Sequence, residues 1–150
     1  MVDKYKVSRI IKAPQKFVFS WCTDFREDDP KITGSSSTRK MLEKTKKRVV
    51  YIATYKGADG NTKMNVNLVM LHPHTSWHLD QFGEEDNEVG DYKLTRLGKE
   101  ETRLDMVFKE TWKNIAQVPS LQEQISSTNR VWDKYVSALE QEYQASLRGR

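Results

Sequence analysis

Hydrophobic and polar residues alternate along most of this chain of 150 residues. The clearest case is TRLDMVFKETWK at 102–113, where Leu104, Met106, Phe108 and Trp112 share one face. A period of two residues is typical of a strand with one buried face. Similar sequence predicts six further strands, so the expected set is 4–12, 35–44, 47–56, 63–71, 76–82, 91–97 and 102–113.

The period changes directly after the first predicted strand. In residues 14–22 the apolar side chains recur three and four positions apart, as on one face of a helix. Pro14 suits the first turn of such a helix, because its missing N–H costs nothing there. We therefore predict a short helix over 14–22 and a second short helical turn around 25–29, which ends near Pro30.

One long helix is predicted at the carboxy-terminal end, from Pro119 to about residue 147. Ser120 and Glu123 have the spacing of a capping box, which marks a helix start. Thr128 interrupts the apolar stripe of this helix, where a larger apolar residue is expected. The stripe consists of Leu121, Ile125, Trp132, Tyr135, Leu139 and Tyr143.

Short polar segments separate the strands. The basic KTKK at 44–47, GADGN at 57–61 and HPHT at 72–75 are turn sequences, and we expect the acidic EEDNE at 84–88 to be a loop. Connections this short favour an antiparallel meander of six strands. The first strand then adds at an edge of the sheet or closes it into a ring. The fold class is α+β, with a curved seven-stranded sheet around the long helix and two short helices after strand 1.

A width argument predicts that this arrangement is hollow. Seven strands span about 33 Å, whereas a helix with its side chains is only about 10–12 Å across. The sheet must curl around the helix, and side chains alone fill the enclosed space with difficulty. We therefore expect a cavity for a small molecule between the sheet and the helix.

The side chains expected to line this cavity are mostly large and adaptable. In the strand 63–71 we expect Met64, Leu68 and Met70 to face inward, whereas the inward face of 47–56 stays undetermined because VVYIATY is apolar on both sides. Three hydroxyl groups in the set can bind polar atoms of a ligand. The predicted ligand-binding residues are Met64, Leu68, Met70, Trp77, Tyr92, Leu94, Met106, Phe108, Trp112, Thr128, Trp132 and Tyr135.

Composition and charge narrow the function classes. The length fits one domain over residues 1–150, and no apolar run approaches the roughly 20 residues of a membrane span. The net charge is +4, but basic and acidic residues alternate, which argues against a nucleic-acid partner. A single cysteine and an amino terminus without an apolar segment favour the cytoplasm over secretion. The oligomeric state stays undetermined.

Glu110 is the candidate acid or base. It shares the parity of Phe108 and Trp112, so it points inward unless a bulge intervenes, and Arg9 and Arg96 have the inward parity needed to pair with it. A buried carboxyl needs a partner or gains a raised pKa, and either condition serves proton transfer. The alternative, which we favour, places Glu110 at the cavity rim with its carboxyl in water.

The sequence predicts no metal site and no cofactor. His72, His74 and His78 are close in sequence, but Pro73 and Thr75 mark a turn, and solvated turn histidines explain the cluster. There is no nucleophile–base motif and no phosphate-binding loop.

The segment IKAPQKFVFSWCTDF at 11–25 resembles the "strand, Ala-Pro, helix, Asp" opening of the SRPBCC superfamily of START-like helix-grip proteins. The closing VWDKYVSALEQEY at 131–143 is similar to the gripping helix of that superfamily. The resemblance covers essentially the whole chain. It implies binding of sterols, lipids, hormones or polyketides, which some members cyclise or dehydrate.

Three functions follow from these observations. The first is binding or transport of a hydrophobic or aromatic small molecule in the cavity. The second is a polyketide cyclase or dehydratase that uses Glu110 as its acid–base group. The third is a protein-interaction module, since one branch of the superfamily activates a heat-shock ATPase; that branch usually has a tryptophan where this chain has DDPKITGSSST.

Overall fold

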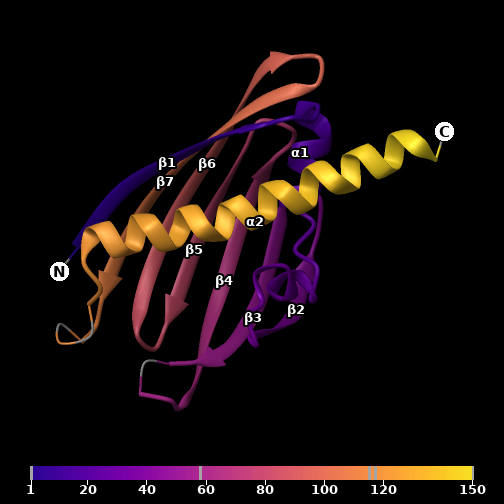
Figure 1. Cartoon of the computed structure of the whole chain (residues 1–150). Coiled ribbons are helices and arrows are strands. Elements are labelled where there is room, and N and C mark those ends of the chain that lie inside the picture. Colours follow the sequence, from indigo (N-terminus) through magenta and orange to yellow (C-terminus); the bar gives the residue numbers. More distant parts are fainter. Residues whose placement is uncertain (1, 58, 115, 117, 150) are drawn as a thin grey trace.

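The computed structural model describes residues 2–57, 59–114, 116 and 118–149, and in it a long helix crosses one face of a seven-stranded sheet (Figure 1). This is the expected helix-grip α+β fold. The elements, in chain order, are β1 (Val2–Ile11), α1 (Gln15–Cys22), the 3-10 helix η1 (Asp29–Thr33), β2 (Thr38–Lys44), β3 (Arg48–Lys56), β4 (Thr62–His72), β5 (Ser76–Gly83), β6 (Asp86–Gly98), β7 (Glu101–Trp112) and α2 (Leu121–Arg148).

The sheet is antiparallel throughout, and β2 to β7 follow one another as a meander. The strand order is β1-β7-β6-β5-β4-β3-β2, so β1 adds at an edge beside β7 and does not close a ring. In this pairing Val7 lies opposite Met106, and both side chains are buried. The sheet therefore keeps two open edges, at β1 and at β2.

Two sequence boundaries are corrected. The predicted loop at 84–88 is shorter, because β6 already begins at Asp86 and pairs with β5 and β7 on both sides. This double pairing overrides the low strand propensity of acidic residues. The second short helix covers Asp29–Thr33 instead of 25–29, with Pro30 in its first turn and Gly34 at a φ of 74° after its end. Phe25 has a φ of 49°, which is not a helical value.

The predicted orientation of β4 is wrong. Met64 and Met70 are 49% and 40% exposed, and Leu68 shares their face, whereas Asn67 and Val69 are buried on the inner face. Residues directly opposite each other in a sheet point to the same side. The inward faces of the neighbouring strands therefore determine the orientation of β4.

The same rule determines β3, whose orientation the sequence left open. Val49 and Tyr51 are buried on the inner face, and Val50 and Ile52 lie on the outer face. Val49 lies opposite Val69 of β4 in the register of the two strands. The outer faces of β3 and β4 consequently share a strip of apolar side chains.

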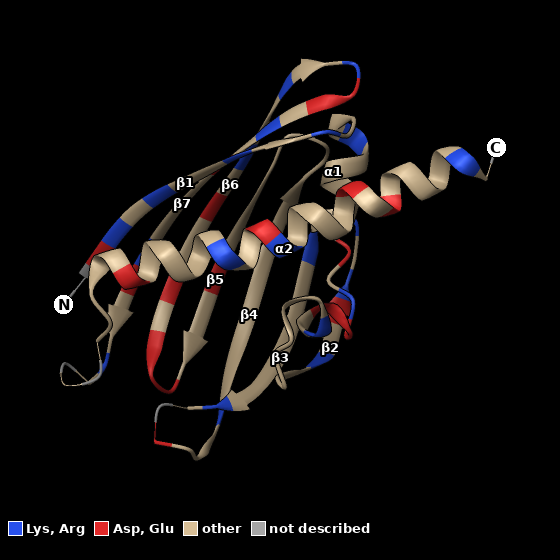
Figure 2. Ribbon diagram, in the orientation of Figure 1, with Lys and Arg blue, Asp and Glu red and all other residues tan. Residues whose placement is uncertain are grey.

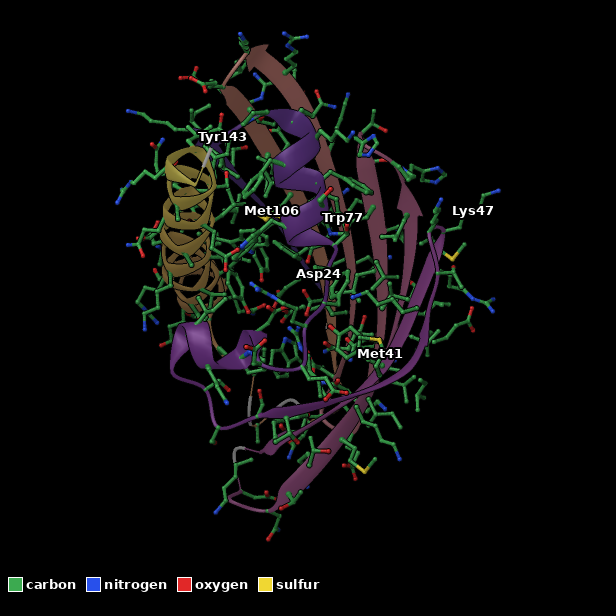
Figure 3. The ribbon with its side chains drawn as sticks, turned by 90° about the vertical axis from the view of Figure 1, so that its right-hand side faces the viewer. Asp24, Met41, Lys47, Trp77, Met106 and Tyr143 are labelled. Atoms are coloured by element: carbon green, nitrogen blue, oxygen red, sulfur yellow. The ribbon has the colours of Figure 1, made fainter. Side chains whose placement is uncertain are left out.

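The buried core packs α1 and α2 against the inner face of the sheet, and several of its fully buried residues come from α1, α2, β1 and β7. Ile11, Val18, Leu104 and Leu139 are each 0% exposed. Figure 3 shows Met106 and Trp77 between α2 and the sheet, whereas Lys47 lies on the far side of the sheet from α2. The rest of the space between helix and sheet is not filled by this cluster.

The start of α2 agrees with the sequence prediction. The Ser120 hydroxyl accepts a hydrogen bond from the Glu123 N–H (3.1 Å), and the Glu123 carboxylate accepts one from the Ser120 N–H (3.2 Å). This capping box satisfies backbone donors that have no partner inside the helix. It also fixes where the helix begins its path across the sheet.

Candidate functional site

A cavity of about 280 Å³ lies between the sheet and the amino-terminal half of α2. Every strand except β4 contributes a side chain to its wall, and α1, the following loop and η1 close one side. The lining residues are Tyr5, Trp21, Cys22, Phe25, Asp29, Arg39, Tyr51, Trp77, Leu79, Glu88, Tyr92, Phe108, Glu110, Ser127, Thr128, Val131, Trp132 and Tyr135.

Aromatic rings form most of one wall. Trp77 and Tyr92 stack with ring centroids 4.9 Å apart and an interplanar angle of 12°. Tyr92 also meets Phe108 edge to face at 5.6 Å and Trp132 of α2 at 6.2 Å. These contacts hold the rings in fixed positions and leave part of their surface facing the cavity.

Gly90 makes the position of Tyr92 possible. A Cβ atom at Gly90 would lie 2.9 Å from Cε2 of Tyr92 and 3.4 Å from Cε1 of Phe108. Glu88, Gly90 and Tyr92 are every second residue of β6, so all three belong to its inner face. The Tyr92 ring therefore leans over the glycine toward Glu88.

Asp86, Glu88 and Glu110 form an acidic floor at one end of the cavity, and of these three Glu88 and Glu110 line the cavity itself. Glu88 of β6 lies directly opposite Glu110 of β7, and both point inward. Oxygen atoms of the three carboxyl groups all lie within 4.8 Å of one another. Figure 2 shows acidic residues along the β5–β6 hairpin, near the amino-terminal half of α2. Three carboxylates at this distance offer oxygen ligands of the kind that a hard cation prefers.

Burial and mutual repulsion raise the pKa values of this acidic floor. Burial, with the charges of Glu110 and Asp86, raises the pKa of Glu88 to about 8. Burial and the charge of Asp86 raise the pKa of Glu110 to about 7, although the Tyr5 hydroxyl acts in the opposite direction. Burial also raises the pKa of Asp86, against the effect of Lys113. The site therefore holds protons near neutral pH.

Tyr5 connects the acidic floor to the long helix. Its hydroxyl donates to Oε1 of Glu110 at 3.4 Å and forms a hydrogen bond of 3.0 Å with Oγ1 of Thr128. Burial raises the pKa of the Tyr5 hydroxyl, so this group remains a neutral donor. The interruption that Thr128 makes in the apolar stripe of α2 thus supplies a hydroxyl to the cavity wall.

The opposite side of the cavity carries a cation that already has a partner. Nη1 of Arg39 lies 3.0 Å from Oδ2 of Asp29, and its guanidinium lies 5.0 Å from the centre of the Tyr51 ring. Burial raises the pKa of Asp29, although Arg39 and Arg26 act against this rise. The charge of Arg39 is therefore largely balanced within the protein.

The structure brings half of the predicted ligand-binding residues together. Glu110 lies inside the cavity and is 9% exposed, so the expectation that it lies at the rim in water is wrong. Leu94 and Met106 are buried in the core without lining the cavity, and Trp112 does not line it either. Of the predicted set, the cavity wall includes Trp77, Tyr92, Phe108, Thr128, Trp132 and Tyr135.

In the described part of the chain, neither of the two arginines that were expected to pair with Glu110 forms an ion pair with it. Nη2 of Arg9 lies 2.9 Å from Oδ1 of Asp133 and donates to Asn129 of α2, so β1 is tied to the helix. Arg96 is exposed at the far end of β6. The alternation along each strand predicted which face of the sheet these arginines share with Glu110. It did not predict how far from Glu110 they lie along the strands.

The three histidines do not converge. His72 at the end of β4 and His74 in the β4–β5 turn are exposed, and His78 lies beside Asp80 and Asp91, with Nδ1 2.6 Å from the Asp91 carboxylate. Neighbouring carboxylates raise the pKa of His78. Within the described residues, the acidic floor is the group of side chains that lie close enough together to bind a metal ion. The histidines do not form such a group.

Several lining residues were missed by the sequence analysis. Tyr5 has the inward parity of β1, so its alternation with Val7 carried a usable signal. Glu88 was missed because its segment was interpreted as a loop, and Arg39 because β2 shows no apolar alternation. Asp29 and Tyr51 become neighbours of Arg39 only in the folded chain.

The chain has the fold of START-like helix-grip proteins, with a cavity between the sheet and the long helix. No protein-family model matches the sequence, and no curated protein sequence matches it significantly. Solved structures match over nearly the full chain. The Zhui aromatase/cyclase from Streptomyces sp. R1128 has a TM-score of 0.73 and 14% identity, over 98% of this chain and 96% of that one.

Two further structures have the same architecture. A START superfamily protein from Mycobacterium smegmatis has a TM-score of 0.68 and 14% identity, over 95% of this chain and 97% of that chain. The major latex-like protein 151 from Panax ginseng has a TM-score of 0.65 and 16% identity, over 91% and 97%. At these identities the comparisons establish the fold, and they confirm the predicted helix-grip architecture.

Two surface properties bear on other functions. None of the helices in the described part of the chain has the length and apolar character needed to cross a bilayer. In and beside the basic turn at 44–47, Nζ of Lys44 lies 2.9 Å from the Asp24 carboxylate, and Arg48 lies 2.8 Å from that of Glu43. Part of the charge of this turn is thus balanced locally.

Proposed function

We propose that this protein binds an apolar or aromatic small molecule in the cavity between α2 and the sheet. The observation that carries the proposal is the cavity of about 280 Å³, with aromatic walls and a few grouped polar side chains. Small-molecule sites commonly combine an apolar surface with a small number of placed polar groups. Burial of apolar ligand surface contributes about 25 cal/mol per Å² to affinity.

The rings on the cavity wall also favour a flat ligand. Tyr92 contacts Trp77, Phe108 and Trp132, so these four rings form one connected surface. A flat aromatic ligand gains stacking or edge-to-face contacts from such a surface in addition to its burial.

Burial raises the pKa of Cys22 and so keeps its thiol protonated in the cavity wall. We place this activity in the cytoplasm, where a lone cysteine stays reduced.

Native mass spectrometry of freshly purified protein, followed by thermal unfolding with candidate ligands, tests the proposal. A ligand that binds only the folded state raises the melting temperature, by an amount equivalent to about 2.7 kcal/mol at one hundred times Kd. Ligand binding should also change the fluorescence of Trp77 and Trp132, which line the cavity. A library of apolar and aromatic compounds that neither shifts the melting temperature nor changes the fluorescence would contradict it.

A second function has a specific observation in its favour. Glu110 is buried in the cavity wall, where burial and the charge of Asp86 raise its pKa to about 7, so its carboxyl can both give and accept a proton near neutral pH. The Tyr5 hydroxyl, 3.4 Å away, orients this carboxyl. We propose a cyclase or dehydratase reaction as the alternative, with Glu110 as the general acid–base group. Three of the structural neighbours are aromatase/cyclases.

Glu110→Gln separates the two functions, because glutamine keeps the shape of the side chain but cannot transfer the proton. A binding protein keeps most of its affinity for a neutral ligand after this change. An enzyme keeps binding its substrate but loses turnover, by about 10²–10⁴-fold for a general acid–base group. Retained turnover in Glu110→Gln would exclude Glu110 from the chemistry.

A further inference from the structure

Two of the three acids of the acidic floor, Glu88 and Glu110, have no cationic partner among the described residues. Within the described part of the chain, no lysine, arginine or histidine forms an ion pair with Glu88 or Glu110. Lys113 acts on Asp86, and its ammonium donates to the carbonyl oxygen of Gly83. Glu88 and Glu110 thus have neighbours of their own sign and the neutral hydroxyl of Tyr5.

This arrangement is costly for the unliganded protein. Like charges directly opposite each other on two strands destabilise a sheet, and burial adds the loss of hydration. Two routes relieve the cost: protons can neutralise the carboxyls, or a cation can enter the cavity. Only the second route makes use of the open space above the floor.

The walls around the floor also favour a positive charge. The faces of aromatic rings carry negative electrostatic potential and attract cations within about 6 Å. The Tyr92 ring leans over Gly90 toward Glu88, and it contacts the rings of Trp77, Phe108 and Trp132. Carboxylates beside a group of aromatic rings are a suitable environment for an organic ammonium group.

The opposite end of the cavity offers little free positive charge that would favour an anionic ligand instead. Arg39 is paired with Asp29 at 3.0 Å and lies over Tyr51, so it offers little free charge to an anionic ligand. The uncompensated charge in the cavity is therefore negative and lies at one end.

We propose that the cavity binds an organic cation, an aromatic or apolar molecule whose protonated amine lies between Glu88 and Glu110 while its ring system packs against Tyr92 and Trp132. This inference rests on the proposed function and narrows its ligand class. The Tyr5 hydroxyl, fixed by Thr128, orients the Glu110 carboxyl toward the amine. The aromatic part of the ligand then occupies the space between α2 and β5.

Proton release on binding distinguishes a cationic ligand from a neutral one. The pKa values of about 8 for Glu88 and about 7 for Glu110 belong to the cavity without a ligand. A cation favours the ionised carboxyls, so its binding releases protons and its affinity rises between about pH 6 and pH 8. A neutral ligand that accepts hydrogen bonds from protonated carboxyls shows the opposite trend.

Other titratable groups near the floor do not reverse this trend. Asp86, with its own raised pKa, is a further acid of the floor, and the tyrosines of the wall stay neutral across this pH range. None of the three histidines lines the cavity. The titratable and charged groups that face the site from the surrounding elements are Asp3, Tyr5, Cys22, Asp29, Arg39, Tyr51, Asp86, Tyr92, Lys113 and Tyr135.

The test compares two probes of the same shape, 1-naphthylmethylamine and 1-naphthylmethanol, by calorimetric titration at several pH values. We expect the amine to bind about tenfold more tightly than the alcohol at pH 8, a difference of about 1.4 kcal/mol. The preference should shrink toward pH 6, and titrations in two buffers of different ionisation enthalpy should show proton release. Equal binding of both probes overturns the cation proposal and leaves the proposed function intact. Binding of neither probe, nor of other aromatic compounds, contradicts the proposed function itself.

Variants locate the effect. Glu88→Gln and Glu110→Gln should each reduce the affinity for the amine about tenfold and leave the affinity for the alcohol nearly unchanged. Glu101→Gln is the matched control, since Glu101 is exposed at the other end of β7. Both floor variants relieve repulsion between the carboxyls, so we expect them to fold. Unchanged amine affinity in both floor variants overturns the proposal.

A divalent metal ion is the competing occupant of the floor. Thermal unfolding with Mg²⁺, Ca²⁺ or Mn²⁺ alone distinguishes it, because a metal site raises the melting temperature without any aromatic group. Stabilisation by a metal ion that disappears in Glu88→Gln, without preference for the amine, overturns the organic-cation proposal in favour of a metal site. A melting temperature that the metal ions leave unchanged, together with tighter binding of the amine than of the alcohol, supports the organic-cation proposal.

Discussion

Glu88 and Glu110 lie directly opposite each other on β6 and β7, and both face the cavity. Tyr5 donates a hydrogen bond to only one of them, Glu110. A pair of acids in this position destabilises the sheet that holds it when both are charged. The pair is therefore better explained by what enters the cavity than by the stability of the sheet.

The pair should make stability depend on pH in an unusual direction. The pKa values of about 8 and 7 lie above the ordinary value of 4.5, so the folded state binds more protons than the unfolded chain between about pH 4.5 and pH 8. The free energy of unfolding then falls as pH rises through this window, and the contribution is complete below it. Urea unfolding of Glu88→Gln from pH 5 to pH 8.5 should show a flatter profile and a gain of at least ~1 kcal/mol at the upper end.

Glu101→Gln serves as the control for this profile, because the exposed carboxyl of Glu101 lies outside the acidic floor. Its pH dependence should match that of the unaltered protein. An unaltered protein whose stability rises steadily from pH 5 to pH 8 would show that the two carboxyls are not protonated in the folded state.

The orientation of β4 can be tested with two neighbouring residues. Leu71 is 8% exposed on the inner face, whereas Met70 is 40% exposed on the outer face. Leu71→Ala should lower the free energy of unfolding by about 2–5 kcal/mol, because it leaves a cavity in the core. Met70→Ala should change it by less than ~1 kcal/mol. Equal effects in chemical denaturation would contradict the orientation of β4.

Gly90 should be intolerant of a side chain. In Gly90→Ala the new Cβ atom meets the Tyr92 ring at 2.9 Å, so the ring must move away from its stack on Trp77. We expect a loss of about 1–3 kcal/mol and weaker binding of aromatic probes. Gly98→Ala is the control on the same strand, where the new Cβ atom lies 4.0 Å from its nearest neighbour. If Gly90→Ala behaves like Gly98→Ala, the ring is not held as described.

The capping box of α2 gives a further stability test. Ser120→Ala removes the acceptor for the Glu123 N–H and should cost about 1 kcal/mol. Ser137→Ala, in the middle of the same helix and exposed, should be neutral or slightly stabilising because alanine is the better helix former. Thermal unfolding of both variants measures the difference. A Ser120→Ala variant as stable as Ser137→Ala would show that the capping box does not stabilise the protein.

Much of the fold could be predicted from local patterns. The alternation in TRLDMVFKETWK placed Leu104, Met106 and Phe108 on the buried face of β7, and the spacing of Ser120 and Glu123 marked the start of α2. These features depend on contacts within one element, so the order of residues along the chain carries them. The width of a seven-stranded sheet against one helix was also enough to predict a hollow interior.

The tertiary structure decided which faces and which side chains surround that interior. In β4 both faces carry apolar residues, and the inward orientation follows from Tyr51 and Trp77 on the neighbouring strands, which force Asn67 and Leu71 to the same side. Glu88 meets Glu110 only because β6 extends through the acidic segment and pairs with β7. The sequence by itself determined the elements, their order and the need for a cavity. The cavity's acidic floor was decided by strand register, because register joins residues that are distant in the chain and no local period records it.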